Sequence, residues 1–391
     1  MYNYINSKIK FIFKLNLGIK MVNQNMDCYD DFVEIHKVTN FKNLLDIITI
    51  NDKQDLRENF IFRGIKNIEY DLIPSAFRHD DEKDNKKINN YISDSEFQFY
   101  LNKQLTIFDL NGDEKTGFLY APIDKDEKPI LQKPKYTVRS EGELQFKREI
   151  YVLLKFLNYA DKIGLKIPSN TSIRQQIHNC LDYSDNGEEM WPKPEFYEII
   201  SLAQHHNLPT RALDWSYDYK VALYFAVEDI IDNRDNDCVL WAFNYNVFEE
   251  KNMTPKNIDK KEGLIIYRPE YDVNPNLKAQ KGLFTFWRIK DYVNMDDDTS
   301  FDRIVMNNII RMKSKDSDTI KFHLNGTLYE IEPDEKIFHK FEISGKLKAK
   351  ILKELYLDGY GYENIYPDYY GVVKAIETNV KLERIIKQEK D

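Results

Sequence analysis

Five stretches of the chain are predicted to form helices, and the pattern of apolar positions is the main indication for the longest of them. The longest is 141–165, whose apolar stripe runs through Leu144, Ile150, Leu153, Leu154 and Leu157. A shorter helix is predicted at 41–50, and two more are predicted at 194–205 and 221–231. The fifth helix is predicted to begin at Ser344, a residue type that caps helices well, and to end before Gly359, which suits the C′ position.

Four other stretches are apolar and rich in β-prone residues, and we predict them as strands: 59–64, 238–243, 264–268 and 336–343. The first ends at Gly64, where the absence of a Cβ permits a sharp turn or a close approach of the backbone to a ligand. Helices and strands are interspersed without an internal repeat. We therefore predict an α+β fold.

Polar segments indicate how the chain is organised. Segment 79–141 opens with a charged run and contains Pro and Gly, so we predict an insertion, and its aromatic residues favour a hairpin or lid. Residues 1–31 are predicted to form a flexible lead, in which Met21 and Met26 are alternative starts. One domain is predicted over 32–376, followed by a helical tail over 377–391.

Composition narrows the class of protein. The formal net charge of -9 argues against a general nucleic-acid or membrane surface, because phosphate binding needs a strongly positive patch, and it leaves a local basic groove open. No stretch is long and apolar enough to span a membrane. The cysteines, Cys28, Cys180 and Cys238, lie far apart and lack the spacing of a metal site, which fits a reducing compartment. We predict a cytoplasmic protein with no membrane partner and no metal.

Segment 203–226 runs from the end of one predicted helix into the next and packs polar and aromatic residues into a short stretch. One short turn there holds His205, His206, Arg211, Asp214 and Trp215. Buried polar groups cost free energy unless they are partnered, so such a cluster persists where its members pair with each other or meet a ligand. Arg211 is the strongest candidate for a ligand contact, because a planar guanidinium in a short turn suits phosphate.

Five motifs follow one another along the chain. They are Phe62-Arg63-Gly64, the block 203–216, the helical segment 222–226, the Gln280-x-Gly282-x-Phe284 segment and the tail segment 359–368. Over 32–376 they resemble the FRG domain, a family named for its Phe-Arg-Gly motif that occurs widely in bacteria and phages. Asn207, Ala212 and Ser216 depart from the family pattern. Asn207 preserves the turn, because Asn tolerates the left-handed conformation.

The order of these elements is also similar to that of ADP-ribosyltransferases, whose central sheet holds NAD in a bent conformation. This resemblance implies an ADP-ribosyltransferase-like mixed sheet, with Arg63 at the ribose or phosphate and Gly64 at the nicotinamide amide. Trp215 or Tyr224 is the implied aromatic residue that stacks on nicotinamide. Gln280 lies near the position where these enzymes carry, late in the chain, the glutamate that orients the ribose. The implied cofactor contacts are Phe62, Arg63, Gly64, Thr210, Arg211, Trp215 and Tyr224, and the implied catalytic residues are Arg63, His205, Arg211, Asp214 and Gln280.

The amide of Gln280 carries no negative charge, so it cannot compensate the positive charge that develops on the ribose. It can hydrogen-bond a ribose hydroxyl but cannot stabilise a developing cation by charge, which is usually the largest catalytic contribution. Glu262, Glu270 or Asp214 is a candidate for the missing carboxylate. If none of them acts, the domain is predicted to bind a nucleotide without turning it over.

The same residues also have structural interpretations. Arg63 and Asp214 can form an ion pair that braces the strand against the turn. Trp215 and Tyr224 can belong to the core, and Gln280 can cap a helix. His205 and His206 are adjacent and point in different directions, so at most one of them reaches a ligand.

The resemblance favours a bacterial or phage effector of the toxin or anti-phage type, which transfers ADP-ribose from NAD to a macromolecule or hydrolyses NAD. NAD or a related nucleotide, a protein or nucleic-acid target, and an antitoxin or regulatory partner are the expected partners. Two alternatives stay open. One is a non-catalytic module that senses nucleotides. The other is a metal-dependent nuclease that uses His205, His206, Asp214 and Asp218.

Overall fold

The computed structural model describes seventeen parts of the chain: residues 32–49, 55–80, 83–93, 95–97, 107–108, 114–115, 141–167, 173, 190–231, 235–248, 263–272, 274–289, 300–307, 309–311, 320–324, 327–332 and 335–388. The chain divides into two compact units, which differs from the single predicted domain. Unit 1 is Met1–Leu72, Asp214–Thr285 and Thr299–Asp391, and unit 2 is Ile73–Leu213 and Phe286–Asp298. The predicted lead, 1–31, lies outside the described residues.

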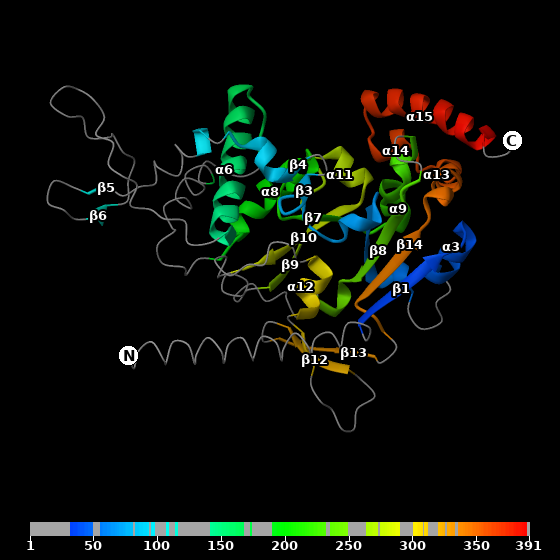
Figure 1. Ribbon diagram of the computed structural model, residues 1–391, viewed down its shortest axis with the longest axis horizontal. Helices are drawn as coiled ribbons and strands as arrows, with labels where there is room; N and C mark the ends of the chain where they lie inside the picture. Colours follow the sequence, from blue (N-terminus) through cyan, green and yellow to red (C-terminus); the bar gives the residue numbers. More distant parts are fainter. Residues whose placement is uncertain are drawn as a thin grey trace. The chain divides into compact units, whose positions relative to one another are not determined.

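A mixed seven-stranded sheet, most of whose residues belong to unit 1, has the strand order β1-β14-β8-β2-β7-β10-β9 (Figure 1). Its strands are β1 (Val33–Val38), β2 (Phe60–Ile65), β7 (Leu213–Ser216), β8 (Cys238–Asn244), β9 (Gly263–Tyr267), β10 (Gly282–Arg288) and β14 (Phe338–Ile343). Strand β1 runs parallel to β14, whereas β14 and β2 each run antiparallel to β8. Helices and a mixed sheet confirm the predicted α+β class.

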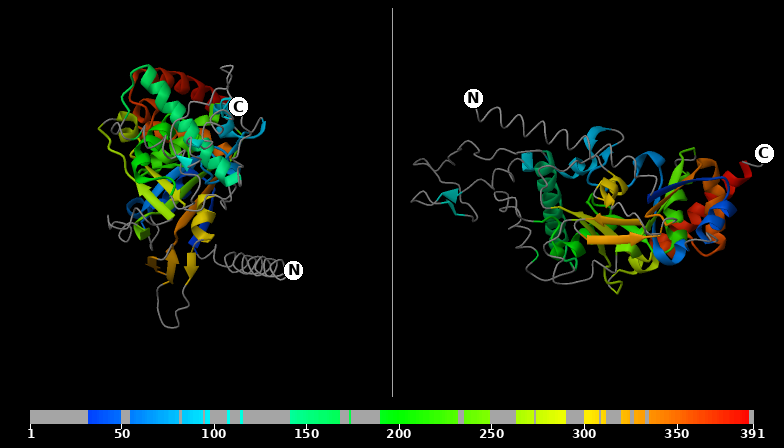
Figure 2. Two further views of the ribbon diagram at one scale, coloured as in Figure 1. Left: turned by 90° about the vertical axis from the view of Figure 1, so that its left-hand side faces the viewer. Right: turned by 90° about the horizontal axis from the view of Figure 1, so that it is seen from below.

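Helix α13 (Lys348–Leu357) packs against both α9 (Tyr219–Val227) and α15 (Tyr369–Gln388) (Figures 1 and 2). The main core of unit 1 lies between the first two of these helices and strands β2, β8 and β14. Its buried members include Phe62, Leu223, Ala226, Leu240, Phe341, Ile351 and Leu355. Apolar residues on one face of each element are thereby removed from water, which is the main favourable term in folding.

Gly64 brings β2 unusually close to α9. A Cβ at this position would stand 1.9 Å from the carbonyl oxygen of Ala222 and 2.6 Å from the backbone nitrogen of Ala226. The strand continues through Gly64 to Ile65, so the sharp turn, one of the two alternatives for this glycine, does not form. The close approach that this glycine permits is to the backbone of helix α9.

Unit 2 is built around α6 (Glu141–Lys162) and α8 (Tyr197–His205), with η4 (Pro194–Phe196) leading into the second helix. A small core joins α6 to the segment before it through Ala76, Ile88, Phe97, Tyr151 and Val152. Within the predicted insertion, β3 (His79–Asp80) pairs with β4 (Lys83–Lys86), η2 (Lys87–Tyr91) follows, and β5 (Ile107–Phe108) pairs with β6 (Glu114–Lys115). Unit 2 therefore extends well beyond the predicted insertion.

Several short elements have no counterpart among the helices and strands predicted from the sequence. They are α4 (Leu56–Asn59), η1 (Ile68–Tyr70), α11 (Pro275–Ala279), α12 (Phe301–Asn307), β11 (Ile309–Arg311), β12 (Ile320–Leu324), β13 (Thr327–Ile331) and α14 (Tyr362–Ile365). The apolar residues Phe301, Val305 and Met306 are buried on one side of α12, so a short amphipathic helix forms within a charged stretch.

The predicted helix boundaries hold with local differences. Helix α3 covers Phe41–Thr49, and α9 begins at Tyr219 because the side chain of Asp218 accepts a hydrogen bond from the backbone of Lys220. Ser344 precedes the 3-10 turn η8 (Gly345–Leu347) that leads into α13, but its side chain makes no capping hydrogen bond. Gly359 follows the helix with a φ of 82°, as expected for a C′ glycine. The predicted tail, 377–391, corresponds to the second part of a longer helix, α15, which begins at Tyr369 and ends at Gln388.

Candidate functional site

Contacts within unit 1 bring together parts of the five sequence motifs. Arg63 on β2 pairs with Asp214 on β7, and Gly64 packs against the motif helix α9. The Ser216 hydroxyl donates to the backbone oxygen of Gln280 (2.7 Å), and the Gln280 amide donates to the backbone oxygen of Ile365 (3.4 Å). We call Arg63, Asp214, Ser216, Asp218 and Gln280 the motif junction.

Arg63 and Asp214 form the charged part of the motif junction. The Nη1 atom of Arg63 lies 2.6 Å from Oδ1 of Asp214 and donates to the backbone oxygen of the same residue at 2.7 Å. The Arg63 side chain is only 10% exposed, whereas that of Asp214 is 51% exposed. The Nε of Arg63 is buried and has no hydrogen-bond partner among the described residues. A buried donor of this kind favours a site where a ligand supplies the acceptor.

Asp218 fixes the start of helix α9 and the turns beside it. Its Oδ2 accepts hydrogen bonds from Nζ of Lys281 (2.9 Å) and from the hydroxyl of Tyr360 (2.8 Å). Its Oδ1 accepts from the backbone nitrogen of Lys220 at 2.9 Å. Burial, followed by the hydrogen bond to Asp218, raises the pKa of Tyr360, so this hydroxyl stays protonated as a donor. Asp218 therefore has a positioning role at the junction.

The aromatic candidates are core residues. Trp215 and Tyr224 are buried, and the indole Nε1 of Trp215 donates to Oγ1 of Thr285 at 2.9 Å. The Tyr224 ring packs edge-on against Tyr362, and burial raises its hydroxyl pKa. Phe62 is fully buried as well. The expectation that Trp215 or Tyr224 offers an open face for nicotinamide is corrected, because neither ring is accessible in this structure.

Arg211 lies in unit 2, and its planar fork is already occupied. Its Nε and Nη2 donate to the two carboxylate oxygens of Glu149 at 2.6 and 2.9 Å. The Nε1 of Trp191 also donates to Glu149, at 3.1 Å, and the guanidinium lies 5.9 Å from the centre of the Trp191 ring. Both charged side chains are almost fully buried. The guanidinium that was predicted to bind phosphate thus forms a buried ion pair, which joins α6 to the turn after α8.

The remaining candidates of unit 2 surround the same turn. The Thr210 hydroxyl donates to Oε1 of Gln204 at 2.8 Å, and its oxygen accepts from the backbone of Ala212. His205 ends helix α8, and its ring meets that of His206 edge-on. Asn207 follows with a φ of 62°, which confirms the predicted left-handed turn residue. These contacts shape the turn.

Sequence reasoning missed Glu149 and Trp191, which decide the role of Arg211. A signal was present in the helix 141–162, where Gln145 and Glu149 are polar residues four positions apart. Both are buried in the structure, and the Gln145 amide donates to the backbone oxygen of Ala76 at 3.0 Å. Polar residues spaced by four share one helix face, so a buried polar face in this helix could have been considered.

The three candidate carboxylates differ in their position relative to the predicted site. Glu262 lies outside the described residues, and Glu270 is exposed. Asp214 directly contacts a predicted site residue, Arg63. Among the residues that the structure describes, His205, His206, Asp214 and Asp218 do not form a group that could hold a metal ion. This arrangement gives no support to the predicted nuclease metal site.

The fold and the junction define an α+β protein in which an arginine on one central strand pairs with a carboxylate on the next. The model of the FRG domain family matches residues 153–235, which supports the FRG family for this chain. The matched region contains Arg211, Asp214 and helix α9, whereas Arg63 and Gln280 lie outside it. No curated protein and no solved structure matches the chain. Within the described parts, no helix has the length and apolar character needed to cross a membrane.

Proposed function

We propose that the motif junction cleaves NAD, transferring ADP-ribose to a macromolecule or to water. One observation carries the proposal: Arg63 is nine-tenths buried with an unpartnered Nε, and it stands beside the half-exposed carboxylate of Asp214. A guanidinium suits the diphosphate of a dinucleotide, because it presents several donors in a fixed plane. A carboxylate next to it suits the ribose, where positive charge develops during cleavage.

The chemistry assigns a separate role to each group. Nicotinamide leaves with the electron pair of its bond to the ribose C1′, and C1′ acquires cationic character. Asp214 stabilises that charge, while Arg63 holds the diphosphate through N–H groups not used by Asp214. The incoming nucleophile, water or a group on the target, forms the new bond to C1′ and releases its proton to the solvent. Gln280 contributes to the shape of the site through its contacts with Ser216 and Ile365.

The resemblance to the FRG family supports a biological role as a bacterial or phage effector, of the toxin or anti-phage type. In that role the chain modifies a protein or a nucleic acid in the cytoplasm, and a regulatory partner such as an antitoxin restrains it. NAD is a substrate of the proposed reaction.

A nucleotide-binding module is the second candidate, and one observation favours it. The charge of Asp214 is compensated by Arg63 at 2.6 Å, so in this arrangement the carboxylate offers less stabilisation to a developing cation. A junction of this kind can hold a nucleotide and transmit its presence to a partner without breaking a bond.

Labelled NAD separates the two candidates. The purified full chain is incubated with NAD labelled on the adenylate phosphate, alone and with a cell lysate, and free nicotinamide and retained label are followed. The enzyme releases nicotinamide, and the labelled fraction identifies the target as protein, nucleic acid or water. The binding module releases none, but NAD raises its melting temperature by mass action. If nicotinamide is not released, with or without lysate, and NAD does not shift the melting temperature, both candidates are overturned.

A further inference from the structure

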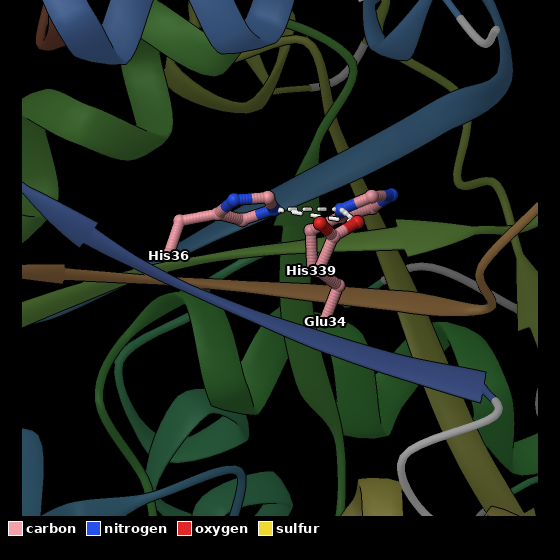
Figure 3. A group of neighbouring side chains, drawn as sticks. All are labelled: Glu34, His36 and His339. Atoms are coloured by element: carbon pink, nitrogen blue, oxygen red, sulfur yellow. Dashed lines mark hydrogen bonds and ion pairs between the residues drawn. The ribbon is translucent and has the colours of Figure 1, made fainter.

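Two histidines and a glutamate meet at the edge of the unit 1 sheet, away from the motifs used above (Figure 3). Glu34 and His36 lie on β1, which is the terminal strand of the sheet, and His339 lies on β14 beside it. Their donor atoms all lie within 4.8 Å of one another. Among the described residues, this trio is the group whose geometry could hold a metal ion.

Strand geometry explains why these three side chains converge. Glu34 and His36 are two positions apart on one strand, so their side chains share one face of the sheet. The parallel register pairs Glu34 with His339, which places the second imidazole next to the first. Figure 3 shows the two rings and the carboxylate directed at one another across β1 and β14. The ligands come from positions 303 residues apart, so no local spacing in the sequence marks them.

The three donor atoms form a triangle of the right size for a first-row metal ion. The Nε2 of His36 lies 2.9 Å from the Nδ1 of His339, and the Glu34 Oε2 lies 3.9 and 3.5 Å from these nitrogens. The point equidistant from three corners with these separations lies about 2.0 Å from each, by the formula for the circumscribed circle. Zinc binds imidazole nitrogen at about 2.0–2.1 Å and carboxylate oxygen at about 2.0–2.2 Å.

The surroundings hold the ligands and leave one side accessible. The His36 ring stacks on Phe341 with centroids 4.7 Å apart, and the His339 ring meets the edge of Phe60 at 5.3 Å. His339 is almost fully buried at 2% exposure, whereas the Glu34 side chain is 47% exposed. Rings fixed by packing lose little freedom when they bind a metal. The accessible side at Glu34 offers a coordination position to water or another ligand.

We propose that Glu34, His36 and His339 bind one divalent first-row transition-metal ion, of which zinc is the one to test first. Two imidazoles and one carboxylate are a ligand set that suits zinc and iron(II), whereas magnesium and calcium prefer oxygen ligands. Binding links β1 to β14 and leaves a position for a water molecule. This inference does not depend on NAD chemistry at the motif junction.

The protonation of the two imidazoles is compatible with metal binding. In the metal-free pair, one of the two facing nitrogens carries the proton of the hydrogen bond between the rings. A metal needs both nitrogens bare, so that proton moves to the other nitrogen of its own ring, and both imidazoles remain neutral. No oxidant or reductant is required.

The test uses the untagged full chain, stripped with a chelator and dialysed, because a histidine tag would bind the same ions. Zinc is titrated in by calorimetry, and Co²⁺ is added separately as a spectroscopic substitute whose visible absorption reports its coordination. The expected result is one zinc bound per chain and the intense absorption of four- or five-coordinate Co²⁺. Binding no tighter than that of His36→Gln overturns the proposal.

Matched variants assign the ion to these residues. Glu34→Gln keeps the size of an exposed side chain and removes its charge, so it should remain folded and weaken zinc binding at least 10-fold. His36→Gln should abolish the Co²⁺ absorption, and His79→Gln, an exposed histidine in unit 2, should leave both readouts unchanged. Circular dichroism verifies the fold of each variant. Zinc affinity in Glu34→Gln equal to that of the wild type shows that the cluster is only a hydrogen-bonded pair of histidines.

Discussion

Arg63 and Arg211 occur in two motifs of one chain, but their surroundings give them different roles. Arg211 donates to both oxygens of a buried carboxylate, so its charge and its fork are used within the fold. Arg63 meets a half-exposed carboxylate through one nitrogen and keeps a buried Nε without a partner among the described residues. At the scale of single residues, burial and partner decide between a structural and a functional arginine.

Gly64 gives a prediction at the residue scale. Gly64→Ala should lower the free energy of unfolding by about 1–3 kcal/mol, because a Cβ would collide with the backbone of helix α9, which cannot move aside locally. Urea unfolding followed by circular dichroism measures the loss. Gly361→Ala is the matched control, because the three atoms nearest its Cβ would all belong to the carboxylate of Glu363, which can rotate away. An equal cost in the two variants would contradict the account of β2 packing.

Helix α6 and the turn after α8 depend on one buried ion pair, which gives a prediction at the scale of elements. Arg211→Ala should destabilise the protein by about 3–5 kcal/mol, because it leaves the Glu149 carboxylate buried without its main partner. Thermal and urea unfolding measure the change.

A surface pair provides the comparison. Lys220→Ala breaks an ion pair with Asp358 whose side chains are both partly exposed, and it should cost at most about 1 kcal/mol. If Arg211→Ala costs no more than Lys220→Ala, then the Arg211 pair is not the brace between α6 and the turn.

The end of helix α9 gives a pH prediction. Glu228 begins η5 (Glu228–Ile231), and burial raises the pKa of its carboxyl above 4.5, although Lys66 at 2.8 Å opposes the shift. The unfolded chain therefore loses this proton at lower pH than the folded chain. Between these two pKa values the folded state binds more protons, so stability contributed by this group falls as pH rises.

Glu228→Gln removes that titration. The free energy of unfolding of the wild type minus that of the variant should decrease as pH rises from 4.5 to 7. Urea unfolding of both proteins across this interval measures the difference. A difference that stays constant or increases with pH would show that the ion pair with Lys66 outweighs burial.

At the scale of the whole molecule, the sequence predicts the α+β class and most long elements, because their apolar periodicity is strong. Helix α3, helix α6, strand β8 and strand β14 lie close to their predicted bounds. Short elements such as α11 and α12 were missed, because a few buried residues within a charged stretch leave little periodic signal. The division into two units was missed because it depends on contacts between distant segments.

The candidate site was predictable only where its residues belong to the sequence motifs. The pairing of Arg63 with Asp214 was one of the two interpretations offered by the motifs, and the structure contains that pair. The burial of Trp215 and Tyr224 was the plainer of two interpretations for aromatic residues in apolar segments. The pairing of Glu149 with Arg211 and the cluster of His36 with His339 could not be inferred, because the paired residues lie far apart in the sequence.

The central claim is that Asp214 and Arg63 at the motif junction act on NAD, and the rate of nicotinamide release tests it most directly. The rate is measured for the wild type, for Asp214→Asn and for Asp358→Asn, a control with a similarly exposed carboxylate in an ion pair, after circular dichroism has verified each fold. The account predicts a loss of about 100-fold or more in Asp214→Asn and an unchanged rate in Asp358→Asn. Equal release by Asp214→Asn and the wild type, or no release by the wild type with or without lysate, would contradict it.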